Sequence, residues 1–163
     1  MILTEDNAYL FWGGPCSQWI TARINIDGEF YNTNEQYMMA CKARLFKDDE
    51  ALAGIMATND PAKQKYWGRL VQGFDTTEWQ KHCRLIVYRA NLAKFTQHPD
   101  LKGWLLYTGE KLIVEASPED KIWGIGLHES DEAAWNTETW QGLNWLGEAI
   151  MQVRSDIRTL AKY

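Results

Sequence analysis

The stretch that decides the fold class runs from Ile20 to Phe46 and reads ITARINIDGEFYNTNEQYMMACKARLF. In its first half, Ile24 and Ile26 alternate with polar residues, as in a half-buried strand. The dipeptide Asp27-Gly28 that follows is a strong signal for a tight hairpin turn. We therefore expect an antiparallel hairpin over residues 20–31.

The second half of this stretch predicts a helix. Thr33 and Gln36 have the spacing of a capping box, so the helix should begin at Thr33 or Asn34 and end near Phe46. Further helices are expected over 48–57, from Pro61, over 78–98 and over 140–160, with Thr76 or Thr77 capping the third and a strand at 111–117. The predicted fold is α+β, a predominantly helical single domain over 1–163 with a small antiparallel hairpin or sheet.

Composition and charge narrow the class of protein. The 163 residues are 45% hydrophobic and 24% charged, which is typical of a globular domain rather than a disordered chain. No apolar run approaches the roughly 18 residues of a membrane span, and the first twelve residues do not resemble a secretory signal. We therefore expect a cytoplasmic protein without a membrane partner. A net charge of −5 argues against binding of duplex nucleic acid mainly through its phosphates, although one small basic pocket is compatible with it.

The cysteines and the nucleotide motifs point to no cofactor. Cys16, Cys41 and Cys83 stand far apart, with no Cys-x-x-Cys pair and no histidine at metal-ligand spacing, so we expect neither a metal nor a disulfide framework. Neither of the common glycine-rich phosphate-binding signatures is present.

A second informative stretch, PEDKIWGIG, covers residues 118–126. Its two glycines, Gly124 and Gly126, would weaken a helix or a strand, so it is expected to be a loop that presents Asp120 and Trp123. An indole face stacks well on planar rings. The alternatives are a solvated acidic turn and a tryptophan that packs in the core.

Glu35 and Lys42 form the first candidate pair on a helix. Seven residues make two helical turns, so the two side chains share a face, with Met38 and Met39 between them. The alternative is that both lie on the solvated side of the helix, where an acid near the N-terminus is favoured by the helix dipole. Trp79 has similar alternatives, a core residue or a binding residue.

Three bases further along the chain, Lys63, Lys65 and Arg69, are candidates for a phosphate-binding face or for a merely solvated one.

The order of the motifs resembles that of the NADAR family, also called YbiA-like, from about Phe11 to Arg154. The most specific parts are the EQYMxxxKA helix and the EASPxDxxWGxG loop. The motifs in order are FWGGPCSQW (11–19), DGEFYNTNEQYMMACKARLF (27–46), NDPAKQKYWGR (59–69), Trp79 with Arg84, KF (94–95), LLYTG (105–109), LIVEASPEDKIWGIG (112–126) and WQGLNWLGEAIMQVR (140–154).

The resemblance implies an N-glycosidase that hydrolyses an N-ribosidic bond. One branch of the family acts on phosphorylated intermediates of riboflavin biosynthesis and releases ribose 5-phosphate. Another removes ADP-ribose from guanine in nucleic acid. The family's N-terminal serine-asparagine-phenylalanine motif is Ser17-Gln18-Trp19 here, a variant that leaves both branches open.

Carried over by position, the resemblance implies catalytic roles for three residues and binding roles for two tryptophans. The catalytic acid matches Glu35, the helix lysine Lys42 and the loop acid Asp120, while Trp79 and Trp123 would line the pocket. Gly124, Gly126 and Arg69 complete the expected substrate site.

The implied chemistry fits these residue types. Cleavage of the C1′–N bond builds an oxocarbenium-like charge that a carboxylate stabilises, while a second carboxylate activates water or protonates the leaving nitrogen. Lys42 would either hold a phosphate or attack C1′ as an amine. The expected partner is a small ribosyl phosphate or ADP-ribosyl compound, alone or on nucleic acid. The rival hypotheses are a non-catalytic module that binds ADP-ribose-like ligands and an interaction protein with an exposed tryptophan patch.

Overall fold

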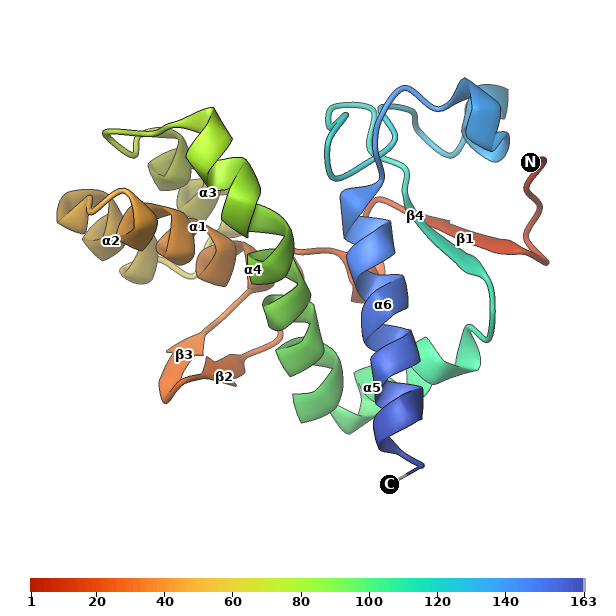
Figure 1. The fold of residues 1–163 in the computed structure, drawn as a ribbon, viewed down its shortest axis with the longest axis horizontal. Coiled ribbons are helices and arrows are strands. Elements are labelled where there is room, and N and C mark those ends of the chain that lie inside the picture. Colours follow the sequence, from red (N-terminus) through yellow and green to blue (C-terminus); the bar gives the residue numbers. More distant parts are fainter. Residues whose placement is uncertain (163) are drawn as a thin grey trace. The chain divides into compact units, whose positions relative to one another are not determined.

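In a computed structural model that describes residues 1–162, the chain divides into two compact units. One unit comprises residues 18–98, and the other comprises residues 1–17 together with residue 99 onward. Each unit is described by itself, and the single-domain organisation expected from the sequence stays a prediction. Figure 1 traces the elements of both units along the chain.

The unit of residues 18–98 begins with the expected hairpin. Strands β2 (Ile24–Ile26) and β3 (Glu29–Tyr31) pair antiparallel, with Ile24 opposite Tyr31. Asp27 and Gly28 take φ angles of 55° and 86°. These are left-handed conformations that this type of turn requires, so the prediction is confirmed.

Helix α1 (Asn34–Leu45) also begins where the sequence predicts. Its N-cap is Thr33, whose hydroxyl accepts a hydrogen bond from the Gln36 N–H at 3.0 Å. The Gln36 side chain accepts from the Asn32 N–H at 2.7 Å rather than from that of Thr33. The reciprocal half of the capping box is therefore shifted by one residue.

Three more helices complete this unit, and the second and third helices of the unit also pack against each other. They are α2 (Asp49–Met56), α3 (Pro61–Arg69) and α4 (Thr76–Gln97), and α1 packs against all three. The expected cap of α4 at Thr76 or Thr77 is wrong. Asp75 caps the helix instead, because its carboxylate accepts from the Glu78 N–H at 3.0 Å.

The other unit contains a pair of parallel strands. Strand β1 (Ala8–Phe11) runs beside β4 (Leu112–Glu115), with Ala8 opposite Leu112 and Phe11 opposite Glu115. Strand β4 lies within the predicted segment 111–117, whereas β1 was not predicted. The small sheet elements are therefore one antiparallel hairpin and one parallel pair. A buried cluster that includes Leu10, Val114 and Ile125 packs at this pair.

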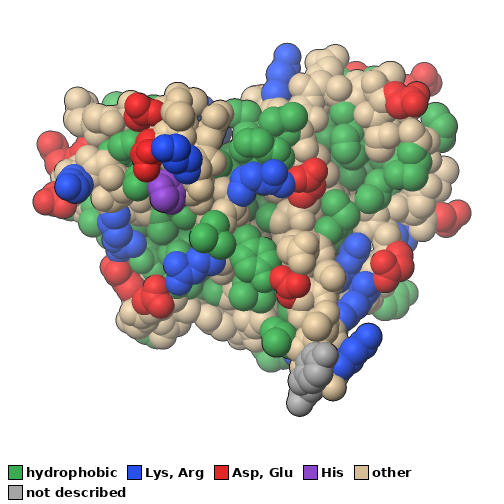
Figure 2. Space-filling view, viewed as in Figure 1, with side chains coloured by type: hydrophobic (Ala, Val, Ile, Leu, Met, Phe, Trp, Pro, Cys, Tyr) green, Lys and Arg blue, Asp and Glu red, His purple; other side chains and the backbone are tan. Residues whose placement is uncertain are grey.

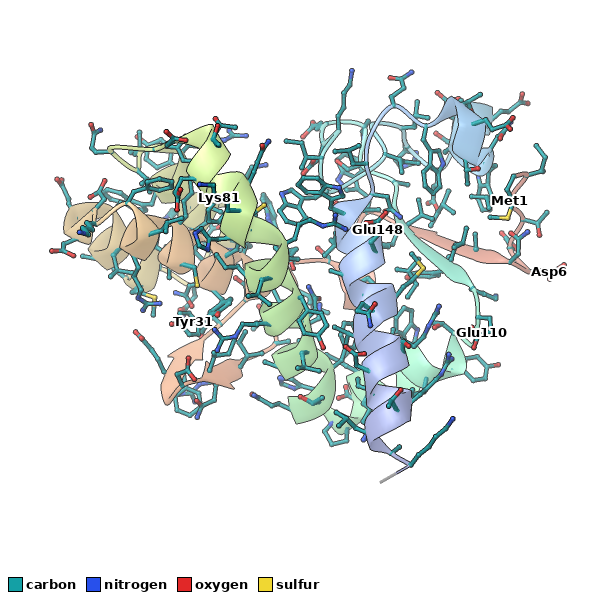
Figure 3. The ribbon with its side chains drawn as sticks, viewed as in Figure 1. Met1, Asp6, Tyr31, Lys81, Glu110 and Glu148 are labelled. Carbon is teal, nitrogen blue, oxygen red and sulfur yellow. The ribbon has the colours of Figure 1, made fainter. Side chains whose placement is uncertain are left out.

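The helices of this unit are α5 (Pro99–Tyr107) and α6 (Trp145–Leu160), with short 3-10 turns η1 (Gly14–Cys16), η2 (Glu132–Trp135) and η3 (Thr137–Thr139). Helix α5 was not predicted, and α6 begins five residues later than expected because Asn144 takes a left-handed φ of 54°. In Figure 3, the labelled Glu110 lies in the turn between α5 and β4, where it accepts a hydrogen bond from Arg158 on α6 at 2.6 Å. The fold is mainly helical α+β, as predicted. Over the described residues, no helix combines the length and apolar character that a membrane crossing needs.

Candidate functional site

Helix α1 places Glu35 in its first turn and buries it. Eight of the twelve residues of this helix are buried, and Glu35 is only 7% exposed. Its backbone N–H donates to the Gln18 carbonyl at 3.1 Å, which ties the start of the helix to the segment before the hairpin. A solvated position for Glu35 is therefore excluded. Burial of a carboxylate carries a desolvation cost, which is typical of functional positions.

Lys42 lies two turns further along α1 and is half-buried. Burial, the largest effect, lowers the pKa of its amine below the ordinary value of 10.5. The negative charge of Glu35 acts in the opposite direction and raises this pKa, whereas the positive charge of Arg69 lowers it. The three charged groups are thus electrostatically coupled, and the fraction of Lys42 that is a neutral, nucleophilic amine is increased.

Helix α3 brings Arg69 to this site because it runs alongside α1. The Thr33 hydroxyl donates to the Gln64 side-chain oxygen at 2.6 Å near the start of both helices. One turn further on, Gly68 lies directly against the Met39 side chain, leaving no room for a β-carbon. Arg69 follows at the end of α3, where its charge acts on Lys42.

Trp79 lies in the first turn of α4, and its side chain is only 9% exposed. A stacking role for Trp79 stays a prediction. Two aromatic side chains of the same unit are far more accessible, Trp19 at 44% and Phe74 at 43%. The Lys42 ammonium lies 4.4 Å from the centroid of the Phe74 ring. Neither Trp19 nor Phe74 was predicted from the sequence as a site residue. For Phe74, an apolar residue in a loop between two helices was an available signal.

In the other unit, the loop of residues 118–126 is confirmed, and Asp120 organises it. One oxygen of this carboxylate accepts from the N–H groups of Ile122 at 2.9 Å and Trp123 at 2.8 Å. This is the geometry of an Asx turn. The Trp123 ring packs edge to face on Trp145, with centroids 5.8 Å apart. The loop thus holds its acid and its indole in defined positions.

The two glycines of this loop serve its own packing. Gly126 takes a φ of +72°, and both glycines are buried. A β-carbon on Gly124 would lie 2.8 Å from the Glu115 carbonyl oxygen and 3.0 Å from that of Asp120. These contacts explain the glycines without a ligand, and their contact with substrate stays a prediction.

Backbone carbonyls of the same loop cap the start of α6, which has no side-chain cap. They satisfy N–H groups that a helix terminus leaves without intrahelical partners. The pairs are Leu143 N–H to Lys121, Asn144 N–H to Gly124, Trp145 N–H to Ile122 and Leu146 N–H to Trp123, at 3.0 to 3.2 Å. The loop and the helix start are therefore one hydrogen-bonded assembly.

The structure thus brings Glu35, Lys42 and Arg69 together in one unit, and Asp120 and Trp123 together in the other. A single pocket that combines the two groups stays a prediction. Within residues 1–162, no three or more His, Cys, Asp and Glu side chains are grouped in a way that could hold a metal ion.

The fold, the buried Glu35 and the half-buried Lys42 define a mainly helical α+β protein with a polar site on its first long helix. The family model of the NADAR domain matches residues 10–158, so the chain belongs to the NADAR domain family and the resemblance expected from the sequence is confirmed.

Its relatives include an N-glycosidase of Acanthamoeba polyphaga mimivirus, 45% identical over 166 aligned positions that cover 93% of this chain and 98% of the relative. The riboflavin biosynthesis protein PYRR of Zea mays is 36% identical over 70% of this chain, which spans only 15% of that relative. The NMR structure of Escherichia coli YbiA has the same fold, with a TM-score of 0.78 at 24% identity over 98% of this chain and 90% of YbiA.

Proposed function

We propose that this chain is an N-glycosidase, a hydrolase acting on the N-ribosidic bond of a phosphorylated base. The substrate class is that of riboflavin-biosynthesis intermediates, from which the enzyme releases ribose 5-phosphate. The observation that carries this proposal is the buried Glu35 on the same helix as the amine of Lys42, whose pKa burial lowers. The mimivirus relative named N-glycosidase, which aligns over 98% of its length, supports the reaction class.

Glu35 is assigned the role of stabilising the positive charge that develops on the sugar. As the C1′–N bond breaks, positive charge spreads over C1′ and the ring oxygen, and a buried carboxylate next to it stabilises the transition state. Asp120 is assigned to the second acid–base role, through the carboxylate oxygen that is not engaged in its turn. Trp123 is assigned to stacking on one face of the base.

Lys42 is assigned the role of nucleophile at the anomeric carbon, C1′. Its neutral amine attacks C1′ while the leaving nitrogen takes a proton from the general acid. The sugar ring opens, and a Schiff base between Lys42 and C1′ remains until water hydrolyses it to free the sugar phosphate and the amine. Arg69 would hold the phosphate of the sugar.

The test supplies the full chain with a ribosylaminopyrimidine 5′-phosphate and, separately, with an ADP-ribosylated guanine oligonucleotide. Mass spectrometry measures released ribose 5-phosphate in the first reaction and released ADP-ribose in the second. We expect ribose 5-phosphate, and a loss on the order of 10²–10⁴ in rate for Glu35→Gln. Glu50→Gln, which changes an exposed acid of α2, should retain the wild-type rate.

Other outcomes would overturn parts of this assignment. Release of ADP-ribose alone would move the substrate to nucleic acid, and ligand binding without release of either product would indicate a binding module. Full activity of Glu35→Gln would remove Glu35 from the mechanism. Borohydride added during turnover should fix the reduced sugar on Lys42, and an unchanged protein mass would exclude the Schiff base.

A further inference from the structure

A row of cations lies on one face of α3 beside the site. Lys65 and Arg69 are four residues apart, so they are neighbours on the helix surface. Within residues 1–162, neither forms an ion pair with a carboxylate. Arg69 is close enough to Lys42 to lower its pKa, which extends the row onto α1. Adjacent cations that lack acidic partners repel one another, so an anionic ligand would relieve this repulsion.

The unit of residues 18–98 as a whole is positively charged, like the row of cations on α3. Residues 18–98 contain eleven Lys and Arg against nine Asp and Glu, a formal charge of +2, whereas the whole chain carries −5. On the face drawn in Figure 2, blue Lys and Arg side chains lie among green hydrophobic and red Asp and Glu side chains where this unit is exposed. Bases mixed with accessible apolar side chains are typical of surfaces that bind nucleotides.

Trp19 lies next to Lys65, at one end of the row of cations. Its side chain is 44% exposed, and the Lys65 ammonium lies 5.9 Å from the centroid of its ring. An exposed indole with a cation at its face offers a planar surface and a positive charge to the same ligand.

The residue before Trp19 fixes its place relative to the buried acid. The Gln18 carbonyl accepts from the Glu35 N–H at 3.1 Å, and the Gln18 side-chain oxygen accepts from Asn91 at 3.2 Å. Asn91 is fully buried and also accepts from the Asn34 side chain at 3.0 Å. The main chain that carries Trp19 is therefore held next to Glu35 before any ligand binds, which reduces the entropy lost on binding.

We propose that Trp19 and Lys65 form a subsite for the base and phosphate of the substrate, with Trp19 stacking on the ring and Lys65, together with Arg69, holding the phosphate. The ligand class is a phosphorylated nucleoside. This inference rests on the proposed function, and it adds Trp19 to the site as a specificity-determining residue. The link between the main chain next to Trp19 and the first turn of α1, which carries Glu35, is consistent with a base that is attached to the reacting carbon.

The chain offers matched controls for both residues. Lys63 is exposed and lies two residues before the half-buried Lys65, which places it about 200° away around the helix on another face. Trp12 is 51% exposed and belongs to the other unit, where its ring contacts His128. Substitution of these controls changes the same residue types at positions that are not part of the proposed subsite.

The test is isothermal titration of the full chain with three probes, GMP, guanosine and ribose 5-phosphate. We expect Trp19→Ala to weaken GMP and guanosine by about 5- to 150-fold, the range that 1–3 kcal/mol of stacking gives, and to leave ribose 5-phosphate unchanged. Trp19→Phe should retain most of the affinity. Lys65→Gln should weaken the two phosphorylated probes and leave guanosine unchanged, while Lys63→Gln and Trp12→Phe should match the wild type.

Several results would overturn the proposal. These are a wild type that binds no GMP at millimolar concentration, a Trp19→Ala chain that binds GMP as the wild type does, and equal losses in Lys63→Gln and Lys65→Gln. If Trp19→Ala unfolds, the comparison of Trp19→Phe with Trp19→Leu decides in its place. Because binding needs no turnover, a chain that binds GMP through Trp19 but cleaves nothing would overturn the proposed function alone.

Discussion

At the scale of single residues, the environment of Lys42 is shaped by one aromatic ring. Phe74 packs edge to face on Phe46, with centroids 5.3 Å apart, and its own face lies 4.4 Å from the Lys42 ammonium. The loop that carries it is pinned, because the Gln72 N–H donates to the Asp48 carboxylate at 2.8 Å. The ring attracts the ammonium, and it also covers part of the ammonium and so contributes to the burial that lowers the pKa of Lys42.

We therefore expect Phe74→Ala to raise the pKa of Lys42 back toward 10.5, because water replaces the ring. Phe74→Leu excludes water without a π face, so it should keep the pKa low. A reaction that needs the neutral amine gains rate as pH rises through this pKa, so Phe74→Ala should move that rise to higher pH. NMR titration of ¹³C-methylated lysines and the pH profile of kcat/KM measure the two shifts.

Phe30→Ala, at a similarly exposed phenylalanine of the hairpin, serves as the control. An unchanged Lys42 titration in Phe74→Ala would contradict the shielding role. The pKa of Lys42 also determines how the free energy of unfolding changes with pH. The folded pKa of Lys42 lies below its unfolded value, so between the two values the unfolded state binds more protons, and the free energy of unfolding rises with pH.

At the scale of elements, α2 and α3 meet where Gly54 faces the Trp67 ring. A β-carbon at Gly54 would overlap ring atoms of Trp67, so the two helices approach as closely as a bare backbone allows. This contact supports the position of α3 and, with it, the Lys65–Arg69 face.

We expect Gly54→Ala to lower the free energy of unfolding by about 1–3 kcal/mol, since overpacking outweighs the gain in helix propensity. Gly103, inside α5, has no atom within 4 Å of its would-be β-carbon. Gly103→Ala should therefore stabilise the chain by up to about 1 kcal/mol. Urea unfolding measures both, and a stabilising Gly54→Ala would show that Trp67 moves aside without cost.

The helices and strands that could be predicted correctly are those that a short sequence pattern, such as a turn or a helix cap, specifies. The Asp27-Gly28 turn and the Thr33 cap each act within a few residues, so the hairpin and α1 were located correctly. The parallel pairing of β1 with β4 joins segments about a hundred residues apart, and no local pattern carries that information. Helix α5 was missed because it follows α4 directly, so Pro99 was interpreted only as the end of the preceding helix.

The same distinction applies to the site. The seven-residue spacing of Glu35 and Lys42 lies in one helix and could be predicted, although their burial depends on neighbouring helices. The approach of Lys65 to Trp19 and of Phe74 to Lys42 comes from tertiary packing, so spacing could not suggest either. Conversely, Gly124 and Gly126, which could be interpreted from the sequence as leaving room for a ligand, are explained by packing within the loop itself.

At the scale of the whole molecule, charge is unevenly shared. Residues 18–98 carry +2, and the remaining residues carry thirteen Asp and Glu against six Lys and Arg. An anionic ligand therefore meets attraction at the Lys65–Arg69 face and repulsion from much of the chain. Salt screens both effects, since the Debye length is about 10 Å at 0.1 M.

We expect the affinity for GMP to fall as sodium chloride rises from about 0.05 to 0.5 M, despite the net charge of −5, because short-range contacts with cations dominate. Guanosine, which has no phosphate, should show little change. Titration at three salt concentrations measures this, with Lys65→Gln expected to have a shallower dependence. Affinity for GMP that increases with salt would show that long-range repulsion dominates instead.

The backbone capping of α6 by residues 121–124 has a kinetic consequence. A loop that opens to admit substrate or release product must give up its contacts at little cost. Here, opening would strip four N–H groups at the start of α6 of their acceptors, and each such group costs about 1–3 kcal/mol if it stays buried. This segment is therefore unsuited to act as a gate, and a substrate that binds at Asp120 and Trp123, as proposed, would meet a preformed surface.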